Sequence, residues 1–334
     1  MTTSQPRPWM EAWQDALYGP YGFYRSPAGP AAHFLTATHG ALGWELAHGI
    51  LAYLEHSGMP VRTILDIGAG RGELATALVQ AGAERSAWAD TSTPGLSPRV
   101  VALDVVSRPH GLDERVGWIV SPGGPDLPDD LGQLAGTAVI AHEWLDVVPC
   151  PIAEVDHGRA LREVLVDANG AESLGGPLAE ADAAWCRSHW ATSDPGDRVE
   201  IGRIRDDAWA GLLARIDSGI AIAIDYGHTG AARPPRGTLT GFREGREVDP
   251  IPDGRCDLTA HVAVDSLDAD VVLTQRQALQ DAGLSAALPG TALARTDPRA
   301  YLHELTRANA RAQLVNPASF GGFRWAVKRI PERS

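Results

Sequence analysis

Three glycines at alternate positions carry the strongest chemical signal in the sequence. Gly68, Gly70 and Gly72 follow a short apolar run, and Asp66 stands two places before the first of them. Glycines at the carboxyl end of a strand let the backbone approach a ligand, and they direct the N-terminus of the following helix at it. The alternative is a plain strand-to-helix turn that binds nothing. We expect a nucleotide-like cofactor at this turn.

The spacing of these glycines discriminates between cofactors. The dinucleotide fingerprint requires a third glycine at the position of Glu73, whereas here it comes one residue earlier, so an oxidoreductase that uses NAD is disfavoured. S-adenosylmethionine fits better, because its ammonium group needs a carboxylate partner and its carboxylate group needs backbone N–H donors. We therefore predict S-adenosylmethionine as the cofactor.

A carboxylate at the end of the second strand should accept hydrogen bonds from the ribose hydroxyls of such a cofactor. Asp104 ends the apolar run Val100-Val-Ala-Leu-Asp and is the first candidate. Asp90, in Ala87-Trp-Ala-Asp, is the rival, although a solvated carboxylate at a strand end is the simpler interpretation of Asp90. The sequence favours Asp104 and leaves Asp90 open.

The segment His142-Glu-Trp-Leu-Asp follows another apolar run, so its side chains should emerge on the same edge of the sheet as the glycine turn. Glu143 and Asp146 would then face the transferred group. The segment half-matches the zinc motif H-E-x-x-H, but Asp146 replaces the second histidine, and Pro149 and Pro151 interrupt the helix that would hold both ligands. We therefore predict no metal site. His142 is expected as a buried, hydrogen-bonded histidine more than as a base.

A third acidic segment, Asp225-Tyr-Gly-His, also follows an apolar run and places an acid and an aromatic ring on that edge. Capping a turn or a helix is an equally good role for Asp225. Five arginines between Arg233 and Arg255 then lie in a stretch rich in glycine and proline. They could hold an anionic ligand, but pairing with surface carboxylates is the commoner role.

Apolar periodicity indicates the elements that must position these residues. Helical spacing covers residues 9–17 and 38–56, and a helix over 73–81 follows the glycine turn. Short apolar runs, which are typical of strands, precede that turn and recur at residues 99–106, 116–120, 137–141 and 219–225. Strands that alternate with helices predict a parallel sheet covered on both faces.

Four parts of the chain follow from this pattern. They are an N-terminal helical region (1–58), a cofactor-binding core (59–150), an insertion (151–217) and the remainder of the core sheet (218–334). Within the last part, residues 227–257 show no periodicity, and loops of that length are usually functional or disordered. We expect this loop at the active site, and a last strand near 323–330.

Composition limits the classes of protein. Hydrophobic residues make up 44% and charged residues 21% of 334, as in a globular protein. Lys and Arg number 29 against 42 Asp and Glu, a net charge of −13, so neither nucleic acid nor an anionic membrane is expected as a partner. Three scattered cysteines without a C-x-x-C pair, and no secretory signal, suit a cytoplasmic protein. A homodimer stays open.

Taken together, these segments resemble the MidA-type family of class I S-adenosylmethionine-dependent methyltransferases, which includes the mitochondrial complex I assembly factor that methylates a protein arginine. The resemblance spans most of the chain, and its specificity comes from the order and combination of several segments. They are Leu17-Tyr-Gly-Pro-Tyr-Gly-Phe-Tyr, His33-Phe-Leu-Thr-Ala-Thr-His, Leu65-Asp-Ile-Gly-Ala-Gly-Arg-Gly, Ile140-Ala-His-Glu-Trp-Leu-Asp-Val-Val-Pro, and Ile224-Asp-Tyr-Gly-His with Gly237-Thr-Leu-Thr-Gly-Phe-Arg and Asp257-Leu-Thr-Ala-His-Val.

The resemblance implies an α/β fold with a Rossmann-like methyltransferase sheet, an N-terminal helical flap and an inserted substrate-recognition region. The cofactor-binding residues that it implies are Phe34, Thr36 and Thr38 from the flap, Asp66, Gly68, Gly70 and Gly72 on the methionine side, Asp104 on the ribose, and His142. Glu143 and Asp146 would approach the acceptor, and Tyr226 would help to shape its pocket.

We therefore interpret the chain as a methyltransferase that acts on a side chain of a protein or peptide, with an arginine guanidinium favoured by the resemblance. Carboxylates such as Glu143 and Asp146 would orient the planar guanidinium through bidentate hydrogen bonds. One alternative is a small-molecule methyltransferase. The other is a catalytically weak, cofactor-binding assembly factor or scaffold, which the replacement of the family's usual asparagine by His142 keeps open.

Overall fold

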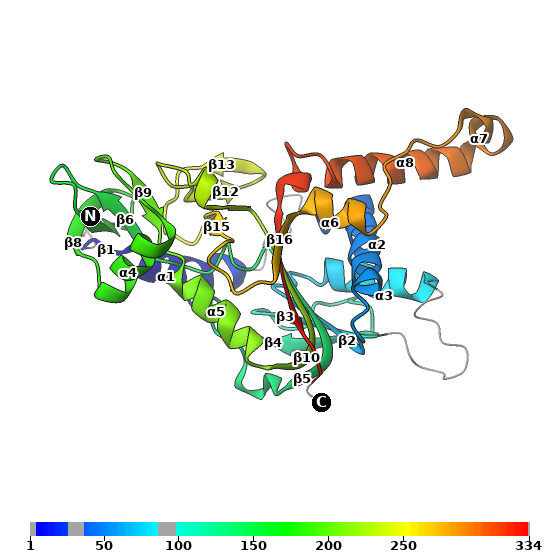
Figure 1. Ribbon diagram of the computed structural model, residues 1–334, viewed down its shortest axis with the longest axis horizontal. Helices are drawn as coiled ribbons and strands as arrows, with labels where there is room; N and C mark the ends of the chain where they lie inside the picture. The colour runs from blue at the N-terminus through cyan, green and yellow to red at the C-terminus, as the bar shows by residue number, and fades with distance from the viewer. Residues whose placement is uncertain (1–4, 26–36, 86–97, 333–334) are drawn as a thin grey trace.

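A seven-stranded sheet forms the centre of the protein (Figure 1). The structure is a computed structural model and describes residues 5–25, 37–85 and 98–332. The strand order across the sheet is β16-β17-β10-β5-β2-β3-β4. In chain order these strands are β2 (Thr63–Ile67), β3 (Arg99–Asp104), β4 (Val116–Val120), β5 (Leu134–His142), β10 (Ile216–Asp225), β16 (Val271–Thr274) and β17 (Arg324–Ile330).

The sheet is mixed, which corrects the expectation of a wholly parallel one. The five strands from β10 to β4 pair in parallel, as predicted from the alternation of strands and helices. The last strand of the chain, β17, pairs antiparallel with β10, and β16 pairs antiparallel with β17. Periodicity of apolar residues reports which face of a strand is buried and does not report the direction of the strand, so the sequence pattern could not show this reversal.

Helices cover both faces of the sheet. On one face lie α2 (Gly40–Ser57), α3 (Glu73–Glu84) and α6 (Gln275–Asp281), and on the other lies α5 (Arg203–Leu213) (Figure 1). Successive residues of β2 reach opposite cores: Ile64 belongs to the cluster under α2 and α3, and Leu65 to the cluster that contains Trp209 of α5. The carboxyl ends of the parallel strands therefore form one edge between two packed layers.

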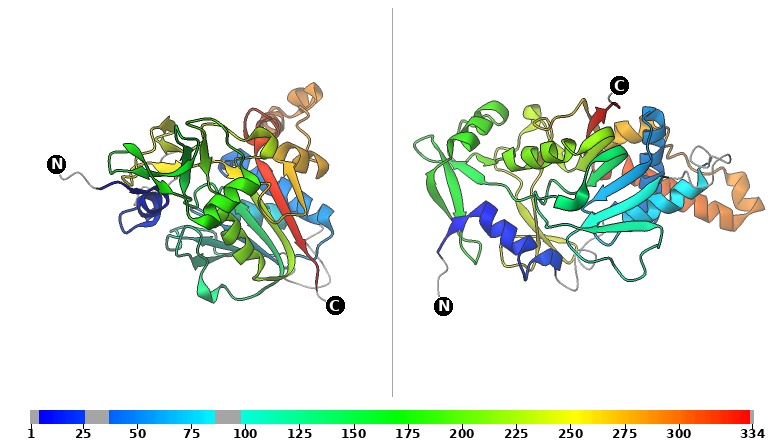
Figure 2. Two further views of the ribbon diagram at one scale, coloured as in Figure 1. Left: turned by 60° about the vertical axis from the view of Figure 1, so that its left-hand side comes forward. Right: turned by 90° about the horizontal axis from the view of Figure 1, so that it is seen from below.

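A second sheet lies beside the first and contains the predicted insertion. Its hairpin of β6 (Ile152–Val155) and β7 (Leu161–Val166) is antiparallel. Three further strands complete this sheet, β1 (Arg7–Pro8), β8 (Glu172–Pro177) and β9 (Arg198–Glu200), and α4 (Glu180–His189) belongs to the same part of the chain. Figure 2 shows the N-terminal helix α1 (Trp9–Tyr18) against this sheet. The N-terminal segment is thus joined to the insertion by the β1–β7 pairing.

The stretch 227–257, expected as one loop without regular structure, contains several short strands. These are β11 (Gly227–His228), β12 (Thr240–Arg243) and β13 (Arg246–Val248), with η5 (Gly230–Ala232) between the first two. β13 pairs with β12, β12 also pairs with β14 (Asp257–Thr259), and β11 pairs with β15 (Val262–Ala263). Strands of two to four residues are too short for a period of two to appear in the sequence.

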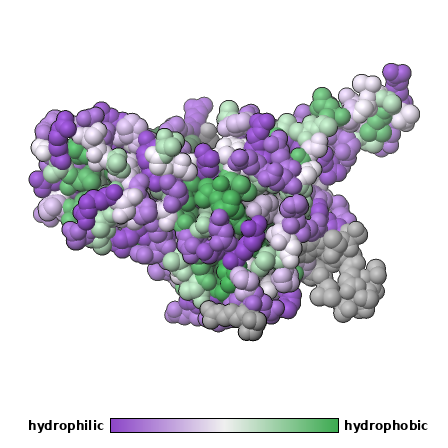
Figure 3. Space-filling model, viewed as in Figure 1, coloured by the Kyte–Doolittle hydropathy of each residue, from purple (hydrophilic) through white to green (hydrophobic). Residues whose placement is uncertain are grey.

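The C-terminal part carries a helical arm, made of α7 (Thr291–Thr296) and the first half of α8 (Pro298–Leu314), that projects from the body (Figure 1). None of residues 285–307, all of which the structure describes, is buried. Hydrophobic residues are visible among the polar ones on this arm in Figure 3. Within the described ranges, no helix combines the length and the apolar character needed to cross a membrane.

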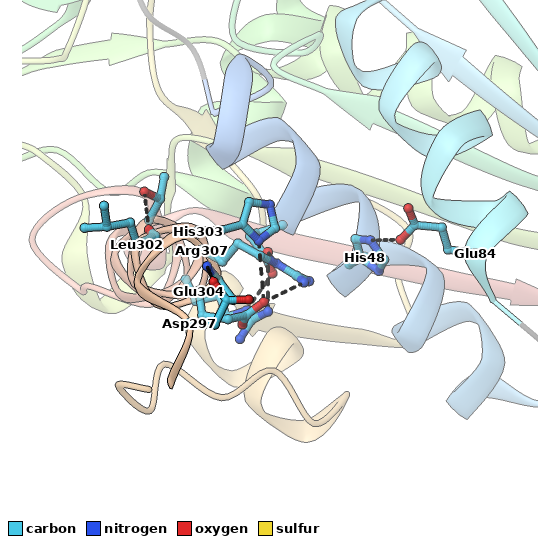
Figure 4. Close-up of polar contacts among 11 residues, drawn as sticks. His48, Glu84, Asp297, Leu302, His303, Glu304 and Arg307 are labelled. Atoms are coloured by element: carbon cyan, nitrogen blue, oxygen red, sulfur yellow. Dashed lines mark hydrogen bonds and ion pairs between the residues drawn. The ribbon is translucent and has the colours of Figure 1, made fainter. Parts of the chain in front are cut away.

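A buried acid attaches the second half of α8 to the body. Glu45 of α2 is 1% exposed and accepts hydrogen bonds from Arg307 and Arg311, the latter at 2.6 Å. Figure 4 shows Arg307 with Glu304 of its own helix, and it shows His48 of α2 with Glu84 of α3. The hydrogen bonds to Glu45 join α2 to α8 on this face of the sheet.

Candidate active site

A cavity opens at the carboxyl ends of β2, β3 and β5 and contains about 1050 Å³ of space free of protein atoms, continuous with solvent. Eight residues predicted for the site line it together: Thr38, Asp66, Gly68, Gly70, Asp104, His142, Glu143 and Asp146. Gly72 lines an adjoining hollow that shares Gly70 and Asp104 with the cavity. Phe34, Thr36 and the rival ribose candidate Asp90 lie outside the described residues.

The glycine turn has a backbone that only glycine adopts easily. The φ angles of Gly68, Gly70 and Gly72 are 71°, 60° and 82°, in the left-handed region. A Cβ atom on Gly70 would face the cavity with only the Glu73 carboxylate near it, at 3.5 Å, whereas a Cβ atom on Gly72 would come within 2.6 Å of Leu112. The missing side chain of Gly70 therefore leaves space for a ligand, and that of Gly72 leaves space for the Leu112 side chain.

Asp104 connects the glycine turn to the end of β3. Its Oδ2 accepts a hydrogen bond from the Gly70 N–H at 2.8 Å, and its Oδ1 accepts one from the Val106 N–H at 3.3 Å. Burial raises the pKa of Asp104 to about 6, although these N–H donors act in the opposite direction. The carboxylate stands at the end of the strand next to β2, where the ribose of a nucleotide lies in sheets of this kind.

Asp66 places an unsatisfied acid in the wall of the cavity. It is 1% exposed, and its Oδ2 has no hydrogen-bond partner in the described structure. Burial, with the nearby charges of Asp104 and Glu73, raises the pKa of Asp66 to about 8. A ligand ammonium group would supply both the missing donor and the missing positive charge. The site therefore fits S-adenosylmethionine, whose ammonium group would bind at Asp66 and whose ribose would bind at Asp104.

Glu143 has an unusual backbone and a buried carboxyl group. Its φ angle is 52°, which is rare for a residue with a side chain, and it directs the side chain into the cavity. Its Oε1 lies 3.4 Å from His142 Nδ1 but makes no hydrogen bond. Burial, and then the charges of Asp146 and Asp257, raises the pKa of Glu143 to about 8. Burial lowers the pKa of His142 to about 4, so this imidazole is neutral near pH 7.

Asp225 holds the turn that carries these acids. Its Oδ2 accepts the backbone N–H groups of Leu145 and Asp146 at 3.0 and 3.1 Å, and its Oδ1 accepts the N–H of Tyr226 at 2.9 Å. Of the two roles left open for Asp225, the structure shows turn capping. Asp146 is itself buried, with Oδ2 accepting from Thr259 at 2.7 Å and Oδ1 without a partner in the described structure.

Tyr226 does not line the cavity. Its side chain is 38% exposed and packs on Phe323, with ring centroids 4.2 Å apart, and on His261 at 5.9 Å. Arg233, the first arginine of the basic stretch, pairs with Asp265 at 2.6 Å and contacts His228. Of the two roles expected for these arginines, Arg233 therefore has the commoner one, which is pairing with a carboxylate of the protein itself.

Several residues in the cavity wall were not assigned to the site from the sequence, and three of them come from the N-terminal segment and β14. They are Tyr18 and Tyr24 from the N-terminal segment and Asp257 from β14. The Tyr24 hydroxyl donates to Asp257 Oδ1 at 2.6 Å, and burial raises the pKa of Asp257 to about 8. Both segments are among those that carry the family resemblance, so the signal was in the sequence, but their spacing along the chain does not show that they meet.

Comparison with known proteins agrees with this geometry. Residues 45–280 match the model of a family described as "Putative S-adenosyl-L-methionine-dependent methyltransferase". A crystal structure from Burkholderia thailandensis, described as a "likely methyl transferase" bound to S-adenosyl-homocysteine, is 25% identical, with a TM-score of 0.69 over 96% of this chain and 87% of that one. Another structure from the same organism, 24% identical, has a TM-score of 0.70 over 97% and 87% of the two chains. Among curated proteins, no match was found.

Proposed function

The chain belongs to the family of S-adenosyl-L-methionine-dependent methyltransferases, and we propose that it methylates a side chain of a protein or peptide, with an arginine guanidinium as the favoured acceptor. The observation that carries this proposal is a pair of carboxylates at the end of β5, the half-buried Glu143 and the buried Asp146. Each has an oxygen without a hydrogen-bond partner in the described structure. Because unsatisfied buried acceptors require donors, a cationic acceptor group with several N–H donors is the best complement.

Methyl transfer requires no covalent intermediate on the protein, because the methyl group passes directly from the cofactor to the acceptor. When bound, S-adenosylmethionine supplies an electrophilic methyl group on a positively charged sulfur. The chain must hold the acceptor nitrogen in line with that methyl group and keep water out of the path. Asp66, Gly70 and Asp104 would hold the cofactor, while Glu143 and Asp146 would orient the guanidinium as a bidentate pair. The strained φ of Glu143 keeps its carboxyl group aimed at this point.

A methylated guanidinium must also lose one proton, and the structure offers an acceptor for it. The pKa of Glu143 is raised to about 8, so its carboxylate is a stronger base than an ordinary glutamate. The adjacent His142, whose pKa is lowered to about 4, stays neutral, so it does not place a second positive charge beside Glu143 that would compete with the guanidinium. Glu143 would therefore serve both as an orienting group and as the base at its Oε1 or Oε2 atom.

The proposal is tested by the position of the transferred methyl group. The purified protein is incubated with cell extract and S-adenosylmethionine labelled on its methyl group, and labelled peptides are identified by mass spectrometry. We expect the label on arginine side chains, and its loss with the Asp104→Ala variant, which lacks the ribose contact. Label on lysine, on a carboxylate or only on small molecules would contradict the arginine proposal.

A further inference from the structure

The acids that line the cavity fall into two groups, and the negative charges that act on each acid come from its own group. Asp66 is affected by the charges of Asp104 and Glu73, at the glycine turn. Glu143 is affected instead by the charges of Asp146 and Asp257. The first group serves the cofactor. The second includes an acid from β14 and lines the same cavity.

Among the described residues, Asp146 accepts a side-chain hydrogen bond from Thr259 and Asp257 accepts one from Tyr24, and both donors are neutral hydroxyl groups. Burial raises the pKa of Asp146, and the Thr259 hydrogen bond and the positive charge of Arg205, which is 1% exposed, act in the opposite direction. The four hydrogen bonds of Arg205 all go to backbone carbonyl groups, however, namely those of Val148, Ala260, His261 and Asp146. Asp146 is 4% exposed, lines the cavity, and keeps its Oδ1 free of hydrogen bonds in the described structure. A buried carboxylate oxygen without a hydrogen bond can accept one from a donor group of a ligand.

Two tyrosines complete this end of the cavity. The rings of Tyr18 and Tyr24 lie 5.4 Å apart between centroids, tilted by 40°, and both line the cavity. The Tyr24 hydroxyl donates to Asp257 Oδ1 at 2.6 Å, which leaves Tyr24 fixed beside the acid. Aromatic faces next to carboxylates favour a flat cation, because the ring quadrupole and the negative charges attract the same group.

These residues are held rigidly, although they come from distant parts of the chain. The Tyr18 hydroxyl donates to the Val147 carbonyl at 3.1 Å, which ties the end of α1 to the turn after β5. The Trp13 indole donates to the Leu258 carbonyl at 3.0 Å, which ties α1 to β14 next to Asp257. The N-terminal segment and β14 therefore form one packed unit over the cavity, as a selective subsite requires.

We propose that Tyr24 and Asp257, together with Tyr18 and Asp146, form the acceptor subsite, and that this subsite selects a planar cation carried on a side chain. The inference rests on the proposed function, since it concerns the acceptor of the same transfer, and it assigns specificity to residues outside the main sheet. Asp257 joins Glu143 and Asp146 in binding the N–H groups, and the two rings bound the flat faces.

Two small probes test the selection directly. The full chain is saturated with S-adenosylhomocysteine and titrated, by ligand-observed NMR, with Nα-acetyl-arginine N-methylamide and with its neutral isostere, Nα-acetyl-citrulline N-methylamide. We expect the arginine probe to bind roughly tenfold more tightly than the citrulline probe, because only the first satisfies both carboxylates. Equal binding of the two probes, or binding of neither, would overturn the proposal.

Variants then show which residues discriminate between the two probes. Asp257→Asn should lower the affinity for the arginine probe by roughly tenfold and leave the affinity for S-adenosylhomocysteine unchanged. The unchanged cofactor affinity also verifies that the variant is folded. Asp249→Asn, an exposed acid of the same part of the chain, is the matched control for loss of charge and should change neither affinity. If Asp257→Asn does not fold, Tyr24→Phe is the second test, since it removes only one hydroxyl group. The Tyr24 hydrogen bond lowers the pKa of Asp257, so its removal should move the pH at which arginine-probe binding appears to a higher value.

The outcomes separate this inference from the proposed function. If labelled methyl groups appear on arginine but Asp257→Asn and Tyr24→Phe bind the probe like the wild type, the subsite is wrong and the function stands. If the label appears on another residue while the variants still lose the arginine probe, the subsite stands and the arginine assignment fails.

Discussion

Asp104 at the end of β3 accepts a hydrogen bond from the Gly70 N–H at 2.8 Å. The bond joins the glycine turn after β2 to the neighbouring strand, so the two cofactor elements are positioned relative to each other before any ligand binds. Such preorganisation reduces the ordering cost of binding. It also means that a change at either residue should affect the shape of the cofactor site as well as its chemistry.

Replacing Gly70 tests the cofactor site. Gly70→Val should abolish binding of S-adenosylhomocysteine, because a branched side chain would fill the ligand space at a φ of 60°. Gly58→Val is a matched control, since Gly58 has a φ of 67° with open space around it and lies at the end of α2. Isothermal titration should show normal binding by the control. Micromolar binding by a folded Gly70→Val protein would refute the assignment.

The ribose candidates can be separated in the same way. Asp104→Ala should weaken cofactor binding by about 1.5 to 3 kcal/mol, the usual contribution of hydrogen bonds to a charged group, whereas Asp90→Ala should have little effect. Binding constants for both variants, measured beside the wild type, give the answer. A larger loss at Asp90 would mean that the ribose acid has been misplaced.

The acceptor carboxylates should matter for turnover more than for cofactor affinity. Glu143→Gln and Asp146→Asn keep the size of each side chain and remove its charge, so both should lose turnover on a guanidinium acceptor while S-adenosylhomocysteine affinity stays within a few fold. Initial rates and titrations of the two variants provide the measurement. Near wild-type rates on the true acceptor would contradict the arginine proposal.

Asp66 should make both cofactor affinity and stability depend on pH. Its pKa of about 8 in the free protein means that the acid is largely protonated at neutral pH, and an ammonium partner requires the ionised form. Affinity for S-adenosylhomocysteine should therefore rise with pH towards pH 8 and then level off, with a proton released on binding.

The stability of the free protein should change in the opposite direction. The folded pKa of Asp66 lies above the unfolded value of 3.8, so the folded state binds more protons between these values. Each such group lowers the free energy of unfolding, by at most about 1.4 kcal/mol per pH unit, as pH rises from 4 to 8. Denaturant unfolding of wild type and Asp66→Asn at several pH values measures the difference. A wild-type slope equal to that of Asp66→Asn would show that the acid does not titrate in this range.

The Glu45 contact should determine the stability of the C-terminal helices and not the chemistry. Glu45→Gln leaves Arg307 and Arg311 without their buried charged partner and should lower the free energy of unfolding by about 2 kcal/mol. Glu304→Gln, which removes the more exposed partner of Arg307, should cost less than about 0.5 kcal/mol. Both variants should bind S-adenosylhomocysteine normally. Weakened cofactor binding in Glu45→Gln would indicate coupling between α8 and the site.

The cofactor half of the site could be predicted from the sequence, because its determinants are local. The glycines, Asp66 and the strand-to-helix turn lie within seven residues of one another, and left-handed glycine backbones and apolar runs leave a direct trace in residue type. Asp104, His142, Glu143 and Asp146 could be placed because parallel strands bring their carboxyl ends to one edge.

Tertiary structure alone decided the rest, because those features depend on contacts between distant segments. Tyr24 and Asp257 meet across more than two hundred residues, and residue type along the chain does not report such a contact. Side chains at a strand end alternate in direction, so the Asp225 side chain reaches the turn after β5 while the Tyr226 side chain packs on Phe323 and His261. The antiparallel entry of β17 likewise follows from how the last strand packs beside β10, which the hydrophobic pattern of either strand leaves undetermined.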